Sequence, residues 1–259
     1  MSHTTILVAT DGASRIITFN RPGQRNAVSH LMMREVTDAL IEAQADADIR
    51  CVILTGGPEF FSAGRDLKEA ARSSGEEREQ AKAALRRMTD TMETLKLPVV
   101  AAIEGHCLTG GLELALCCDL RVAGSGATFG ITSARLGTIP GFGGTQRLPR
   151  VVGMARALEI LFSAEPIDVE EAWRIGLINR KAAKGQALAE ALRMVSAYAD
   201  RAPLSLATLK QAVRMGTGLP LADALDLEQK LGATLINTAD RAEGLAAFME
   251  KRKPRFQGR

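Results

Sequence analysis

The stretch from Gly105 to Asp119 constrains the fold and chemistry of this chain more than any other. It follows a short apolar run, Val99 to Ile103, which has the length and composition of a buried strand. Gly105 ends that strand, Thr109 can serve as an N-cap, and Gly110-Gly111 opens a helix. The sequence therefore predicts a strand, a turn and a helix, with a glycine backbone that another molecule can approach closely.

One acidic residue, Glu113, stands one turn into this predicted helix. Burying a carboxylate costs free energy and raises its pKa. The free N–H groups at the start of the helix favour the binding of an oxygen that carries negative charge. These features favour a site for acyl chemistry. The simpler alternative is close packing at the glycine pair, with Glu113 complementing the helix dipole. The helix neighbours of Glu113 are all apolar or small: Leu112, Leu114, Ala115, Leu116, Cys117 and Cys118.

Length and composition exclude several other classes of function. A chain of 259 residues can bury a large core as one domain. Its net charge of +3, with one Trp and one Tyr, argues against a nucleic-acid-binding role. No apolar stretch approaches membrane-spanning length, so we expect a cytoplasmic protein that does not contact membranes.

The cysteines and histidines lack the spacing of a disulfide framework or a metal site. Small buried thiols in a reducing cytosol are the expected state of the cysteines. We therefore predict no bound metal. The residues concerned are Cys51, Cys107, Cys117, Cys118, His3, His30 and His106.

Apolar periodicity predicts a mixed α/β fold followed by a helical region. We place the boundary of the α/β core at residues 1–200 and assign residues 201–259 to the helical region. Strands are predicted at 6–9, 16–19, 51–54, 99–103, 120–123 and 128–130. Helices are predicted at 29–45, 76–95, 110–118, 185–201, 203–215, 221–235 and 239–250.

Two further stretches have the composition of turns that lead into a helix, and the first of them is expected to expose backbone N–H groups. In Phe60 to Leu67, apolar residues give way to Ala63-Gly64 and then to charge at a helix start. The stretch Leu136 to Pro149 is glycine-rich, but it has neither the P-loop lysine nor the dinucleotide fingerprint. Taken alone, each stretch is also compatible with an ordinary tight turn that leads into a helix.

Taken together, these stretches resemble the crotonase superfamily, the enoyl-CoA hydratase/isomerase fold. The motifs occur in the family's order and span nearly the whole chain. They are Phe19-Asn20-Arg21-Pro22 with Asn26-Ala27, Phe61 to Leu67, Gly110 to Ala115, Leu136 to Gly141, and the ending Phe248 to Pro254.

The resemblance implies an α/β (α+β) fold, a crotonase-like spiral of repeated strand-strand-helix units with a helical C-terminal layer. It implies that residues 201–259 form a trimerisation region of a homotrimer or of a homohexamer built as a dimer of trimers. It further implies an acyl-CoA thioester as substrate. Coenzyme A is then part of the substrate, and no separate cofactor is expected.

The resemblance also assigns roles to individual residues. Glu113 would be the acid/base. The N–H groups of Ala63 and Gly110 would hold the thioester oxygen, an arrangement that stabilises an oxyanion. The expected substrate-binding residues are Arg25, Ala27, Ala63, Gly64, Arg65, Asp66, Met88, Gly110 and Gly111.

One position departs from the family's pattern. Hydratases of this fold carry a second catalytic glutamate where this chain has Ser133, a residue that can orient a water molecule but is a poor acid. An enoyl-CoA hydratase-like lyase (EC 4.2.1), with Glu113 and Ser133 at the chemistry, is the expected function. A single-glutamate hydrolase, decarboxylase or ring-processing enzyme, and a catalytically silent CoA-ester-binding paralogue, are the alternatives.

Overall fold

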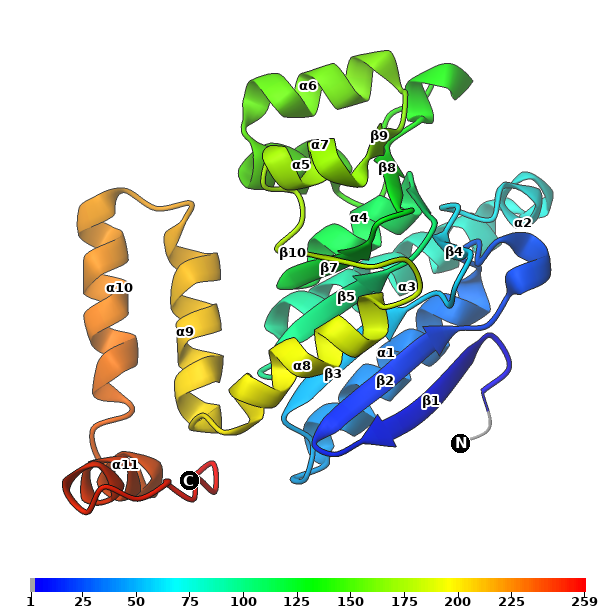
Figure 1. The fold of residues 1–259 in the computed structure, drawn as a ribbon. Helices are drawn as coiled ribbons and strands as arrows, with labels where there is room; N and C mark the ends of the chain where they lie inside the picture. The colour runs from blue at the N-terminus through cyan, green and yellow to red at the C-terminus, as the bar shows by residue number, and fades with distance from the viewer. Residues whose placement is uncertain (1–2) are drawn as a thin grey trace.

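The computed structural model describes residues 3–259 and contains two β-sheets with helices around them (Figure 1). The six-stranded sheet begins with an antiparallel hairpin and is parallel from its second strand onward. In spatial order its strands are β1 (Ile6–Asp11), β2 (Ser14–Phe19), β3 (Cys51–Thr55), β5 (Val99–Ile103), β7 (Leu120–Gly124) and β10 (Arg180–Ala182). The four-stranded sheet contains β4 (Phe60–Ser62), β6 (His106–Leu108), β8 (Thr128–Gly130) and β9 (Ile167–Asp168).

The chain passes from the six-stranded sheet into the four-stranded sheet three times. It does so from β3 to β4, from β5 to β6 and from β7 to β8, and helical turns follow each passage. The predicted repetition of strand-strand-helix units is therefore present. Strands β4, β6 and β8 run parallel to one another, so their carboxyl ends lie at one edge of the smaller sheet.

Helices cover the sheets and form most of the C-terminal part of the chain (Figure 1). The predicted long helices are present to within a few residues, and side-chain caps fix the starts of α1, α3 and α11. Ser29 accepts a hydrogen bond from the Met32 N–H, and Ser74 forms a capping box with Glu77. The helices are α1 (His30–Ala45), α2 (Leu67–Arg72), α3 (Gly75–Thr94), α4 (Gly110–Cys117), α5 (Gly144–Val152), α6 (Met154–Ser163), α7 (Val169–Arg174), α8 (Ala187–Ala199), α9 (Pro203–Gly216), α10 (Leu221–Ala233) and α11 (Ala239–Met249). Two short 3₁₀ turns, η1 (Pro22–Gln24) and η2 (Ser133–Leu136), complete the set.

The central strands β3 and β5 of the six-stranded sheet are buried on both faces, whereas the edge strand β1 is mostly exposed. Along β3, Cys51 and Ile53 pack toward α8, whereas Val52 and Leu54 point into the main core on the other face. Both sets are fully buried, which explains why the strand reads as an unbroken apolar run. The main core continues from this face to α4 and the smaller sheet.

Guanidinium groups fix the carboxyl end of α4. Arg121 donates to the carbonyls of Ala115 and Cys118, and Arg214 of α9 donates to the carbonyl of Cys117. Positive charge at this end of a helix satisfies carbonyls that have no partner within the helix. The position of α4 is therefore fixed from the end opposite to its glycines.

Helix α9 contacts the core through an ion-pair cluster at Asp119. The carboxylate pairs with Lys210 at 2.8 Å and with Arg214 at 2.7 Å. Helices α10 and α11 lie beyond α9, away from the sheets (Figure 1). The division near residue 201 and the trimerisation role of 201–259 stay predictions.

The start of α4 lies directly against β4, and this contact gives a test of the fold. A Cβ on Gly111 would lie 2.4 Å from the Ser62 carbonyl oxygen. We expect Gly111→Ala to lower the free energy of unfolding by about 1–3 kcal/mol, the usual cost of overpacking. Gly126→Ala is the matched control, because its Cβ would meet only Lys184, at 3.8 Å. Chemical denaturation measures both, and equal stability of the two variants would contradict the predicted contact.

Candidate active site

The three parallel strands of the smaller sheet deliver three backbone segments to one place. Residues 63–66 follow β4, Thr109 and Gly110 follow β6, and residues 131–133 follow β8. A Cβ on Gly64 would lie 3.0 Å from the Gly110 nitrogen. The hydroxyls of Thr109 and Thr132 are 2.9 Å apart. Segments far apart in the sequence therefore meet at this edge.

Thr109 occupies the N-cap position of α4 but does not cap the helix with its side chain. Its φ of 48° and ψ of −116° are strained for a β-branched residue, and its hydroxyl bonds Thr132 instead of a helix N–H. Thr109 is the N-cap residue, as predicted, but its side chain makes no capping bond. The hydroxyl pair joins the start of α4 to the segment that carries Ser133.

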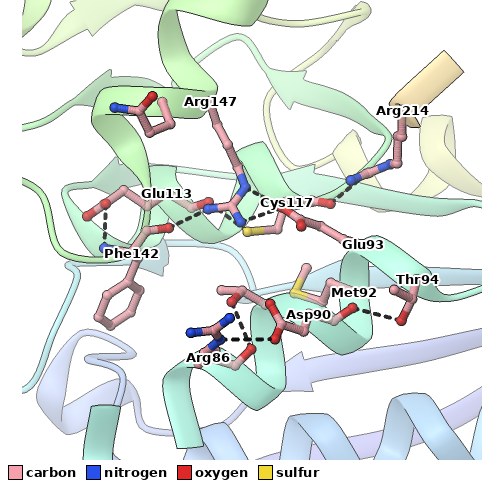
Figure 2. Close-up of polar contacts among 12 residues, drawn as sticks. Arg86, Asp90, Met92, Glu93, Thr94, Glu113, Cys117, Phe142, Arg147 and Arg214 are labelled. Atoms are coloured by element: carbon pink, nitrogen blue, oxygen red, sulfur yellow. Dashed lines mark hydrogen bonds and ion pairs between the residues drawn. The ribbon is translucent and has the colours of Figure 1, made fainter. Parts of the chain in front are cut away.

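Glu113 is buried one turn into α4, with 1% of its surface exposed. Its Oε1 accepts hydrogen bonds from the N–H of Phe142, at 2.7 Å, and of Gly144, at 2.8 Å (Figure 2). Burial raises the pKa of this carboxyl, while the two N–H donors and the cation of Arg147 act in the opposite direction. The net direction is upward, which suits a group that exchanges protons near neutral pH.

The glycine-rich turn before α5 is built around this carboxylate. A Cβ on Gly144 would lie 2.9 Å from Cγ of Glu113, so the absence of a side chain there makes the contact possible. The sequence predicted only a tight turn leading into a helix. The turn's function as the hydrogen-bond partner of Glu113 was missed, since nothing local in residues 141–144 indicates which side chain they face.

The N–H groups that face the site are not the expected pair. The Ala63 N–H donates to the Arg25 carbonyl at 3.0 Å, so it is already used within the protein. The prediction of Ala63 as a donor disagrees with this bond. Across residues 3–259, the N–H groups of Arg65 and Gly110 make no hydrogen bond, and a Cβ on Gly110 would lie 3.2 Å from the Arg65 nitrogen. Arg65 and Gly110 therefore present the available pair of donors.

The segment around Ala27 lies beside the turn that contains Gly64. The Val28 N–H donates to the Gly64 carbonyl at 2.7 Å, and the Asp66 N–H donates to the Val28 carbonyl at 3.0 Å. Arg21 fixes this arrangement by donating to the Ala27 carbonyl and pairing with Asp66. The predicted substrate-binding residues of both segments thus form one surface.

The remaining predicted site residues differ in their exposure. Arg25 is exposed, in a left-handed conformation with φ 53°, and its guanidinium lies 5.7 Å from the centre of the Phe60 ring. Arg65 is also exposed. Ser133 begins η2 and is 5% exposed, whereas Met88 on α3 is fully buried in the main core. A pocket role for Met88 stays a prediction.

Within residues 3–259, no three side chains of His, Cys, Asp or Glu come together so that they could hold a metal ion. Over the same range, no helix has the length and apolar character needed to cross a membrane.

The fold and site define a class of protein: a two-sheet spiral in which two main-chain donors lie beside a helix that carries a buried glutamate. Comparisons with known proteins identify the family. The family model described as enoyl-CoA hydratase/isomerase matches residues 11–259. The chain is 38% identical over 248 residues to the mitochondrial methylglutaconyl-CoA hydratase of Mus musculus, covering 94% of this chain and 79% of that protein.

Solved structures agree with this result. The crystal structure of an enoyl-CoA hydratase from Bacillus anthracis matches with a TM-score of 0.94 at 36% identity, covering 99% of this chain and 100% of that one. Pseudomonas aeruginosa DspI matches with a TM-score of 0.93 at 30% identity, covering 99% and 98%. The chain belongs to the enoyl-CoA hydratase/isomerase family, and its fold is the crotonase fold, as predicted.

The raised pKa of Glu113 predicts a pH-dependent effect on stability. A carboxyl whose folded pKa is raised stabilises the fold below its unfolded pKa, about 4.5, and loses that contribution as the pH rises through the folded value. Glu113→Gln keeps an oxygen for both N–H donors but cannot ionise. We therefore expect the variant to gain stability relative to the wild type between pH 4 and pH 8.

Denaturant unfolding at pH 4, 6 and 8 measures this difference. The same substitution at the exposed Glu76 of α3 controls for the loss of one negative charge. A stability difference at Glu113 that does not change with pH would show that burial does not govern its ionisation.

Proposed function

We propose that this protein is an acyl-CoA-processing lyase that hydrates an enoyl-CoA thioester, or dehydrates the corresponding hydroxyacyl-CoA. The observation that carries the proposal is the buried carboxylate of Glu113 beside the N–H groups of Arg65 and Gly110. The names of relatives support it, since the mouse protein is a methylglutaconyl-CoA hydratase and the similar Bacillus anthracis structure is that of an enoyl-CoA hydratase.

In the proposed reaction, the thioester oxygen accepts hydrogen bonds from the backbone N–H groups of Arg65 and Gly110. Arg65 takes the donor role that the sequence assigned to Ala63. Ionised Glu113 takes a proton from water as the water oxygen bonds to C3. The C2–C3 π electrons move toward C1, so that charge develops on the thioester oxygen, which the two donors stabilise. Glu113 then returns the proton to C2, which closes the balance of atoms and charge. Ser133 would orient the water through its hydroxyl.

The joined segments 25–28 and 63–66 are proposed to hold the coenzyme A part of the substrate. Arg25 and Arg65 are exposed and are available to pair with phosphates. Met88, with the half-buried Leu85 on the same helix, is proposed to form part of the acyl pocket wall. The identity of the acyl group then depends on how α3 packs around it.

Ser133 itself favours a second candidate. A site with one carboxylate suits a hydrolase, decarboxylase or ring-processing enzyme that acts on a CoA thioester and needs a single acid/base. A catalytically silent CoA-ester-binding paralogue is less well supported, because a protein that only binds gains nothing from burying Glu113 at its desolvation cost.

We also propose that the protein assembles as a homotrimer or a homohexamer through its C-terminal helices. The support is their exposed apolar surface, which a lone chain would leave in water. A groove of about 530 Å³ lies between α9 and α10 and is lined mainly by apolar residues. The exposed apolar residues of these helices include Leu209, Val213, Leu221, Leu225, Leu245, Phe248 and Met249.

The function is tested by turnover in a Glu113→Gln variant. A panel of acyl-CoA esters that includes crotonyl-CoA identifies the ester with the highest kcat/KM. On that ester we expect Glu113→Gln to lower kcat by roughly 10²–10⁴-fold, because general acid–base help is lost while binding remains. Glu104→Gln, the same change at a buried carboxylate that bonds the Ala187 N–H, is the matched control. Unchanged turnover in Glu113→Gln would contradict the proposal, and a wild type that binds esters without turnover would favour the silent paralogue.

A second test addresses Ser133. On crotonyl-CoA, Ser133→Glu should raise activity, because two neighbouring carboxylates can share one proton and serve as an acid and a base. On the preferred ester we expect a decrease, because the added charge repels ionised Glu113. Ser133→Ala removes the hydroxyl without adding charge and separates the two effects. If a folded Ser133→Glu variant changes neither activity, residue 133 does not take part in the reaction.

A further inference from the structure

We propose that Arg147, held by Glu93, is a positioning residue for the Glu113 carboxylate. It fixes the glycine turn that donates to Glu113 and places a cation beside the same carboxylate. Neither residue is among the predicted site residues. The kinetic part of the proposal rests on the function proposed above, whereas the structural part does not.

The contacts of Arg147 connect three elements of the structure (Figure 2). From α5, its Nε donates to Oε1 of Glu93 on α3 at 2.7 Å, and its Nη2 donates to the same oxygen. Its Nη1 donates to the Phe142 carbonyl at 2.7 Å. The N–H of that same residue, Phe142, donates to Glu113. One guanidinium thus ties α3 to the turn that binds the carboxylate.

The turn is shaped to admit both side chains. Gly143 has φ 91°, a conformation that favours glycine, and a Cβ on it would lie 2.0 Å from Nη1 of Arg147. The next residue, Gly144, leaves the corresponding space for Glu113. Two consecutive glycines therefore make room for an arginine and for a glutamate. A turn that served only as a connection would need neither space.

Charge supports the same assignment. The ion pair of Arg147 and Glu93 is partly shielded from water, with side-chain exposures of 22% and 37%. Electrostatic effects are stronger away from bulk water, so the cation favours the ionised form of Glu113. Elements packed against α4 also carry Glu93 and Asp90 on α3, Arg150 on α5, and His106 and the buried thiol of Cys107 on β6, while α4 itself carries the buried thiol of Cys117.

Kinetics on the preferred ester test the positioning role. We expect Arg147→Gln to lower kcat by roughly 10–100-fold, a typical loss for removing the support of a catalytic group, with little change in KM. The limb of the pH–rate profile that belongs to Glu113 should move to higher pH, because the cation that favours ionisation is gone. Arg147→Lys keeps the positive charge, so the same limb of its pH–rate profile should lie close to the wild-type position. Its kcat should lie between those of Arg147→Gln and the wild type.

Two further variants separate positioning from general loosening of the turn. Glu93→Gln frees the guanidinium but leaves its charge, so kcat should fall without the limb moving to higher pH. Arg150→Gln removes an exposed arginine from the same helix and should change neither quantity. If Arg147→Gln left kcat and the limb unchanged, or if Glu93→Gln moved the limb upward equally, the proposal would be overturned.

A double-mutant cycle tests the coupling without any substrate. Unfolding free energies of the wild type, Arg147→Gln, Glu113→Gln and the double variant give the interaction between the two side chains. We expect a stabilising coupling at pH 8 that shrinks at pH 4, where Glu113 is protonated. The cycle with Arg150 should show none. If the cycle shows coupling but no ester is turned over, only the proposed function is contradicted. If turnover needs Glu113 but the cycle shows no coupling, only this inference is contradicted.

Discussion

Burial of the Glu113 carboxylate is the interaction on which the rest of this site depends. A carboxylate that is 1% exposed must recover its lost hydration through hydrogen bonds, or the fold bears the full desolvation cost. The donors come from Phe142 and Gly144, which lie 29 and 31 residues further along the chain. The turn that opens α5 must therefore close over α4. This requirement links α4, which follows β5 and β6, to a turn that comes after β7 and β8.

The parallel order of β4, β6 and β8 supplies the other half of the arrangement. Because their carboxyl ends share one edge, the turns after β4 and β6 bring the N–H groups of Arg65 and Gly110 together without any polar side chain. Main-chain donors in a folded turn are already oriented, so they can stabilise developing charge without reorganising. Small residues at Gly64 and Gly110 follow from this, since a side chain on either would meet the neighbouring turn.

Sequence reasoning located the main parts of the site but not their contacts. Glu113 stands out because it is the one charge in an apolar helix, and Gly110 stands out because glycines rarely open helices without a reason. The sequence assigned the donor role to Ala63 and not to Arg65, because the direction of each N–H in that turn depends on its pairing with residues 25–28, which are distant in sequence. Strand β6 has three residues after a glycine, too few for periodicity to reveal. Arg147 has the sequence context of an ordinary helix arginine, and only the folded turn shows what it binds.

In the proposed site, serine in place of a second carboxylate would change what controls the ionisation of Glu113. Two carboxylates close together titrate as a coupled pair and share a proton, so neither has a pKa of its own. With serine at the second position, the balance lies between desolvation, which favours the neutral acid, and the N–H groups of Phe142 and Gly144 together with the cation of Arg147, which favour the carboxylate. A single acid/base must be ionised to take a proton and neutral to return it, so its pKa cannot lie far from the working pH. Desolvation opposed by fixed donors and one cation is a way to satisfy that condition with a single carboxylate, and under the proposed function it would make the geometry of the glycine turn part of the chemistry.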